Sequence, residues 1–185
     1  MVDIKLRPIT HTHDERAMGH GLFWPALEVD AVSCTFNPEG FSPMRAVIRG
    51  LGREPDDFTG PGVSTYHRRR FSVVSHAFDT RPVVITSSRT ATWEAEPQAA
   101  AEIIRVADIE SSRSLCMTHF SFLPGRFPEL AFEQCVHAAM LARYWTQVAR
   151  ITIDIDERYR RQAEGVLQEA LRRWDPLPGV IRGAS

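Results

Sequence analysis

The sequence has little cysteine, almost no lysine and no long hydrophobic run. Its three cysteines, Cys34, Cys116 and Cys135, never form a CxxC pair, which excludes a disulfide framework and a zinc clamp of paired thiolates. The longest apolar-leaning run, residues 135–142, is far shorter than the roughly 20 residues that span a bilayer. The charged N-terminus lacks the pattern of a secretory signal. We therefore expect a cytoplasmic protein with no membrane partner.

Charge is nearly balanced along the chain. The 185 residues include 22 basic and 23 acidic side chains, for a net charge of -1, and 43% of the residues are hydrophobic. This length and composition predict a single globular domain over residues 1–185, with a loose tail at 176–185. Lys5 is the only lysine, so the basic side chains are almost all arginine. The small net charge disfavours nucleic acid as a partner.

Hydrophobic periodicity divides the chain into a strand-rich first half and a helix-rich last third. Residues 29–36 and 44–48 alternate around a turn at 37–40, and residues 71–78 and 83–93 form a second such pair. Helical spacing then starts at Pro97 and again near residue 129, where it continues to about residue 148. Between these helices, residues 115–122 are typical of a buried strand.

The C-terminal region shows the clearest pattern. Ile151, Ile153 and Ile155 alternate in a half-buried strand, and Asp156 is placed to cap the helix that follows. Taken together, the patterns predict an α+β fold. We expect an antiparallel or mixed β-sheet built from N-terminal hairpins, two or three helices packed on one face, and a C-terminal strand–helix unit.

Histidines near the N-terminus form the first candidate site. His11 and His13 point the same way in an extended chain, and His20 follows. Imidazole is a common ligand of zinc and iron. These three residues are therefore a candidate metal site, and they would support a small metal-assisted enzyme.

The second candidate is the pair His119 and Ser121. Two residues apart on a strand, they share one face, so the imidazole can move protons while the hydroxyl holds a phosphate. The pair resembles half of the signature of the 2H phosphoesterases, which implies His119 and Ser121 as catalytic residues. That family uses two such pairs, and the sequence holds no second one.

Two further groups are candidate binding residues. Tyr66, Arg68 and Arg70 share a face of an extended segment, where they could hold a phosphate or stack on a base. Phe23 and Trp24 lie in a region rich in proline and glycine, where aromatic side chains can serve as exposed anchors for a partner.

No complete catalytic motif is present: the sequence has no GxSxG, GxGxxG, GxxxxGK or HExxH. We therefore favour a non-catalytic binding or accessory protein, such as an adaptor, an immunity-type inhibitor or the partner subunit of a modifying enzyme. Its partner would be a protein or a peptide held on a sheet edge. The metal-assisted enzyme and the phosphoesterase remain the alternatives.

Overall fold

The computed structural model describes residues 2–9, 29–36, 63–67, 72–76, 82–88, 96–120, 129–142 and 144–174. The strands are β1 (Asp3–Ile9), β2 (Ala31–Phe36), β3 (Val63–His67), β4 (Ser72–His76), β5 (Val83–Ser88), β6 (Ser114–Phe120) and β7 (Arg150–Asp156). The helices are α3 (Glu96–Ile109), α4 (Glu129–Ala142), the short 3-10 helix η4 (Glu157–Tyr159) and α5 (Arg160–Trp174).

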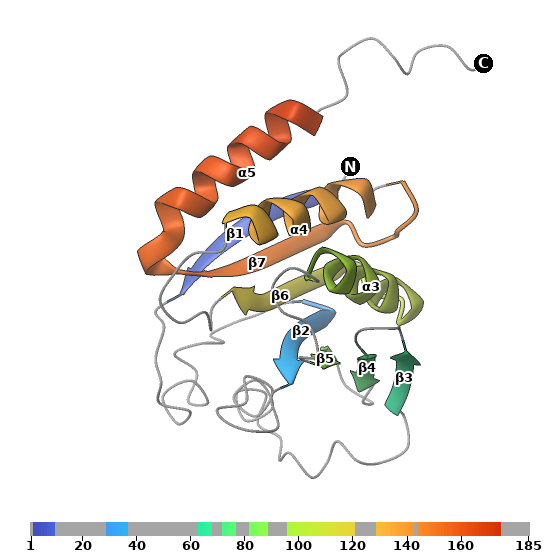
Figure 1. Ribbon diagram of the computed structural model, residues 1–185. Helices are drawn as coiled ribbons and strands as arrows, with labels where there is room; N and C mark the ends of the chain where they lie inside the picture. Colours follow the sequence, from blue (N-terminus) through green and yellow to red (C-terminus); the bar gives the residue numbers. More distant parts are fainter. Residues whose placement is uncertain are drawn as a thin grey trace, which may run out of the picture.

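All seven strands belong to one sheet, in the order β1-β7-β6-β2-β5-β4-β3 (Figure 1). The first five strands in this order, β1-β7-β6-β2-β5, are all parallel to one another. Strand β4 pairs with β5 in the antiparallel sense, and β3 pairs with β4 in the same way. The fold is therefore of the α/β type, organised around a parallel sheet.

The prediction of an α+β fold, with an antiparallel or mixed sheet built from N-terminal hairpins, is wrong. Strand β2 lies between two parallel partners, β5 and β6, and is not part of a hairpin pair with them. The expected pairing of residues 72–76 with residues 83–88 is present. The other predicted hairpin partner, residues 44–48, lies outside the described residues.

Three helices lie side by side on one face of the sheet, where α4 contacts both α3 and α5. Helix α3 connects β5 to β6 and helix α4 connects β6 to β7, and both connections move toward β1. Because parallel crossovers are right-handed, two that move in the same direction cover the same face. Between this helical layer and the sheet lies the core, which includes Ile103, Leu115, Phe132, Ile153 and Ala163.

The opposite face of the central strands is buried as well. Val32, Val84 and Cys116 have no exposed surface, although their neighbours in sequence point toward the helices. Parallel sheets are normally covered on both faces, so their strands lack the alternation of hydrophobic and polar residues that marks a half-exposed hairpin. This double burial explains why the sequence predicts a strand at residues 29–36 but not its parallel partners β5 and β6.

Several local predictions are confirmed, with shifted ends. The C-terminal strand and helix are present, and the Asp156 side chain accepts a hydrogen bond from the Arg158 backbone N–H at the start of η4. Helix α4 ends at Ala142 instead of near residue 148. The chain turns there because the Asp108 carboxylate, at the end of α3, accepts hydrogen bonds from Thr146 Oγ1 and the Gln147 N–H.

Candidate functional site

Most residues proposed from the sequence lie outside the described residues. These are His11, His13, His20, Phe23, Trp24, Arg68, Arg70 and Ser121, together with the predicted tail at 176–185. Two others are placed by their backbone alone. Tyr66 of β3 pairs with Val73 of β4, and His119 is the penultimate residue of β6. The roles given to these side chains therefore stay predictions.

The topology identifies one end of the sheet as the place for a ligand. From the carboxyl end of β6 the chain continues to β7, toward β1; from the carboxyl end of β2 it continues to β3, in the opposite direction across the sheet. Strands β2 and β6 are neighbours. In open α/β sheets, ligands bind outside the carboxyl ends of two adjacent strands whose connections diverge in this way.

Strand β6 is irregular at this end. Met117 pairs with Ile153 of β7, whereas Phe120 pairs with Ile155, so Thr118 and His119 together stand opposite the single residue Asp154. This is a β-bulge, a feature that interrupts the ladder and is common beside active sites. His119 thus lies in this bulge at the carboxyl end of β6, and the neighbouring strand carries the buried carboxylate of Asp154.

That carboxylate forms an ion pair across the sheet with Arg7 of β1. The Nε and Nη2 atoms of Arg7 donate to the two carboxylate oxygens of Asp154 over 2.7 and 2.6 Å. The Asp154 side chain is completely buried and that of Arg7 is 24% exposed. Ile4 and Leu6 of β1 pack toward the helices, so alternation places Arg7 on the face of the sheet opposite α3, α4 and α5. A bidentate pair of this kind fixes the orientation of both side chains.

The thiol of Cys116 completes the cluster from β6. Its Sγ lies 3.5 Å from Asp154 Oδ1, to which it donates, and 3.8 Å from Arg7 Nη2. Burial and the nearby carboxylate raise the pKa of Cys116 well above its ordinary value of 9.0. Burial also raises the pKa of Asp154, although Arg7 acts in the opposite direction. The thiol is therefore protonated at neutral pH and is not an activated nucleophile.

A second buried carboxylate follows on the same strand face. Asp156 is 1% exposed and accepts three side-chain hydrogen bonds from Arg158, two from Nε at 3.0 and 3.1 Å and one from Nη2 at 2.6 Å. Hydrogen bonding to Asp156 raises the pKa of Arg158. The Cζ atom of Arg158 lies 5.5 Å from the centroid of the Tyr159 ring. The carboxyl end of β7 thus carries two acidic groups, each paired with an arginine.

Sequence reasoning missed the Arg7 pair. The shared face of Asp154 and Asp156 is visible in the sequence, but the partner of Asp154 lies 147 residues away. Its signal was the alternation of Ile4 and Leu6 with charged residues, which marks β1 as a strand. No local sequence pattern indicates that β1 pairs with β7.

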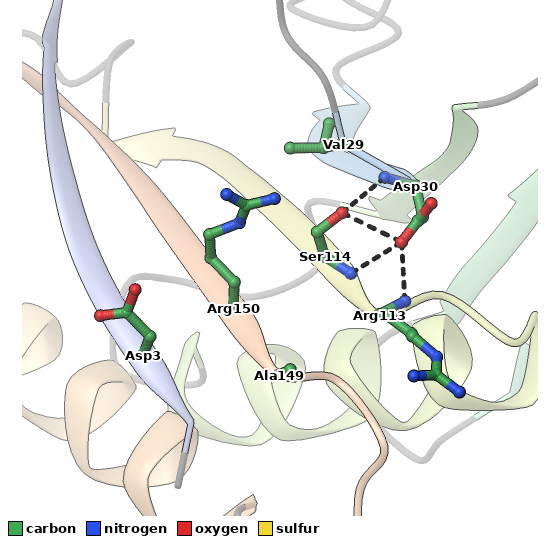
Figure 2. Close-up of a pocket in the computed structure, with 7 residues that line it drawn as sticks. All are labelled: Asp3, Val29, Asp30, Arg113, Ser114, Ala149 and Arg150. Carbon is green, nitrogen blue, oxygen red and sulfur yellow. Dashed lines mark hydrogen bonds between the residues drawn. The ribbon is translucent and has the colours of Figure 1, made fainter.

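The amino-terminal edge of the sheet contains a separate, open hollow of about 600 Å³. It is lined by Asp3, Val29, Asp30, Arg113, Ser114, Ala149 and Arg150 (Figure 2). The Asp30 carboxylate accepts hydrogen bonds from the Arg113 N–H, the Ser114 N–H and Ser114 Oγ, over 2.8 to 3.0 Å. These bonds join the start of β2 to the start of β6, so this carboxylate is a structural element of the edge.

Comparisons with known proteins give no family for the chain: no protein-family model matches it, and no curated protein matches it significantly. Within the described ranges, no group of three or more metal-ligating side chains comes together. Among the same residues, no helix is both long enough and apolar enough to cross a membrane.

Proposed function

We propose that this chain is a binding protein that receives a small polar ligand, with nucleotides as the first class to test, outside the carboxyl ends of β2 and β6. The observation that carries the proposal is the divergence of the chain from these two adjacent parallel strands. Parallel α/β sheets bind nucleotides and related molecules at such points. The proposal retains the non-catalytic function favoured by the sequence and changes its ligand.

Two features of the neighbouring strands support this location. The bulge at Thr118 and His119 removes two residues from the regular ladder at the end of β6. The Arg7–Asp154 pair holds β1 and β7 in fixed geometry beside it. Together they supply a rigid platform, which limits the entropy lost when a ligand binds.

The test measures thermal unfolding of the protein with AMP, ADP, NAD⁺ and inorganic phosphate, each at about 1 mM. A ligand present at about 100 times its Kd stabilises the native state by about 2.7 kcal/mol. We expect at least one nucleotide to raise Tm. Phe36→Arg, which places a large charged side chain on the last residue of β2, should abolish the shift.

Gln147→Arg is the matched control, because residue 147 is exposed and precedes β7 at the other end of the sheet. This variant should keep the full nucleotide response. A panel without any stabilising nucleotide, or a shift that survives Phe36→Arg, would contradict the proposal.

The second candidate is a phosphoesterase reaction, supported by the position of His119 in the bulge at the carboxyl end of β6. In this reading His119 transfers protons and Ser121 holds the phosphate. Hydrolysis of bis-p-nitrophenyl phosphate that His119→Ala abolishes, with nucleotide binding retained, would favour it. Absence of turnover by the wild-type protein would exclude this substrate class.

We also propose that the protein is cytoplasmic and that its N-terminal histidines bind a metal ion. Cys116 and Cys135 form no disulfide within the described part of the chain, in keeping with a reducing compartment. Elemental analysis of the purified protein, with melts in the presence and absence of a chelator, tests zinc or iron at His11, His13 and His20. Stoichiometric metal whose removal lowers Tm would establish the site.

A further inference from the structure

Large apolar side chains are exposed together where α3 and α4 end. Ile109, Leu141, Tyr144 and Trp145 are 50%, 44%, 64% and 47% exposed. Ile109 is the last residue of α3, and Leu141 is next to the last residue of α4. The loop with Tyr144 and Trp145 is tied to α3 by the hydrogen bonds of Asp108 to Thr146 and Gln147. We call these four residues the helix-end patch.

Two arginines lie at the amino-terminal end of the sheet, where Arg113 points toward the helices and Arg150 points away from them (Figure 2). Arg113 and Arg150 are both exposed, and neither forms an ion pair within the described residues. The Arg113 carbonyl accepts hydrogen bonds from the Ala149 and Arg150 N–H groups, which places the two residues on adjacent strands. Arg150 follows Trp145 by five positions in the chain, so their Cα atoms are at most about 18 Å apart.

The acidic groups at this edge are engaged internally. Asp30 accepts hydrogen bonds from the Arg113 N–H and from Ser114, and Asp108 accepts from the loop after α4. Glu110 accepts a hydrogen bond of 2.6 Å from the buried Ser75 hydroxyl. Asp3, the ladder partner of Arg150, is 53% exposed and forms an ion pair of 3.0 Å with Lys5. The positive charges of Arg113 and Arg150 therefore remain exposed without an ion pair within the described residues.

The geometry points to an acidic segment of another protein that lies across this edge, with apolar side chains on the helix-end patch and carboxylates on Arg113 and Arg150. Tyrosine, tryptophan and arginine are the residues that most often dominate binding energy at protein interfaces. The two arginines point in different directions (Figure 2), which suits carboxylates spaced along a peptide better than one phosphate. This surface lies at the opposite end of the sheet from the proposed ligand site.

The aliphatic members and the overall charge argue for a peptide over nucleic acid. Ile109 and Leu141 offer no aromatic face for base stacking, and the sequence pI is about 6.7. An extended segment of about six residues spans the distance from Trp145 to Arg150. The contact needs no change in the backbone of the sheet.

The experiment is selection from a random twelve-residue peptide library displayed on phage, with the intact protein as bait. We expect enrichment of peptides that combine Asp or Glu with Leu, Phe or Trp. A labelled peptide from that pool should lose at least tenfold in affinity on Arg113→Glu/Arg150→Glu, and also on Trp145→Ala. The charge-reversed protein should in turn select basic peptides.

Arg161→Glu is the matched control, because Arg161 is an exposed arginine on α5, outside this edge. It should leave the affinity unchanged, and Tyr144→Ser provides a second patch variant if Trp145→Ala unfolds. No enrichment, enrichment without acidic residues, or binding that the edge variants leave intact would overturn the inference. So would exclusive binding to phosphatidylserine vesicles with the same dependence on Arg113 and Arg150.

Discussion

At the scale of single residues, the ion pair between Arg7 and Asp154 is the most consequential contact. Asp154 is completely buried, so its negative charge depends on the two hydrogen bonds from Arg7. We expect Arg7→Met to lower the free energy of unfolding by about 3 kcal/mol, because it leaves a buried carboxylate unpaired. Urea denaturation monitored by circular dichroism measures this loss.

The control removes both charges at once. Arg7→Met/Asp154→Leu replaces the pair by apolar side chains of similar volume, and such replacements are often neutral. The double variant should therefore recover most of the lost stability. A double variant as unstable as Arg7→Met would contradict this account of the pair.

The thiol of Cys116 makes stability depend on alkaline pH. Its pKa in the folded protein lies well above 9.0, the ordinary value expected after unfolding. Above pH 9.0 the unfolded chain loses this proton while the folded protein keeps it, so stability present below that pH falls as pH rises, by up to about 1.4 kcal/mol per pH unit. Urea denaturation between pH 8 and about pH 10.5 measures the slope, which Cys116→Ala should make shallower.

Val32→Ala serves as the comparison for that experiment. Val32 pairs with Cys116 across the ladder and is equally buried, but it carries no titratable group. This variant should lose stability at every pH and keep the alkaline slope of the wild type. Equal slopes in the wild type and Cys116→Ala would show that the thiol is not responsible.

At the scale of elements, Asp30 joins two strands that are distant in the sequence. Its carboxylate receives three hydrogen bonds from Arg113 and Ser114, and its own N–H donates to the Ser114 carbonyl. We expect Asp30→Ala to cost about 2 kcal/mol in the free energy of unfolding, because backbone donors at the start of β6 lose their acceptor. Thermal or urea unfolding measures the change.

Asp3 provides a matched aspartate in the same hollow. Its ion pair with Lys5 is exposed, with the side chains 53% and 61% accessible, and such pairs contribute at most about 1 kcal/mol. Asp3→Ala should therefore change stability much less than Asp30→Ala. Similar losses in the two variants would refute the role given to Asp30.

At the scale of the whole molecule, strands differ in how many neighbours protect their backbone. β6 lies between β7 and β2, whereas β1 is at the end of the strand order. In native-state hydrogen exchange we expect the amides of β6 and β7 to exchange at least tenfold more slowly than those of β1. Uniform exchange across the three strands would indicate that they open only by global unfolding.

How far the sequence predicts this molecule also depends on scale. Local patterns identified α3, the C-terminal strand and helix, and the cap at Asp156, since each depends on residues close in sequence. The parallel order was not predictable, because a buried parallel strand such as β2 carries no mark of its partners. The Arg7–Asp154 contact was missed for the same reason. The N-terminal histidine candidates and the arginine candidates lie outside the described residues and stay predictions.

The pairing of β1 with β7 determines when the fold can be completed. Asp3 and Arg150 are partners in the ladder, and every strand that separates them in the chain must be synthesised before β1 has its neighbour. During translation, β1 therefore has no strand to pair with until β7 has left the ribosome. Contacts of such long sequence separation slow folding, so the apolar side chains of β1 stay exposed in the nascent chain until β7 is available.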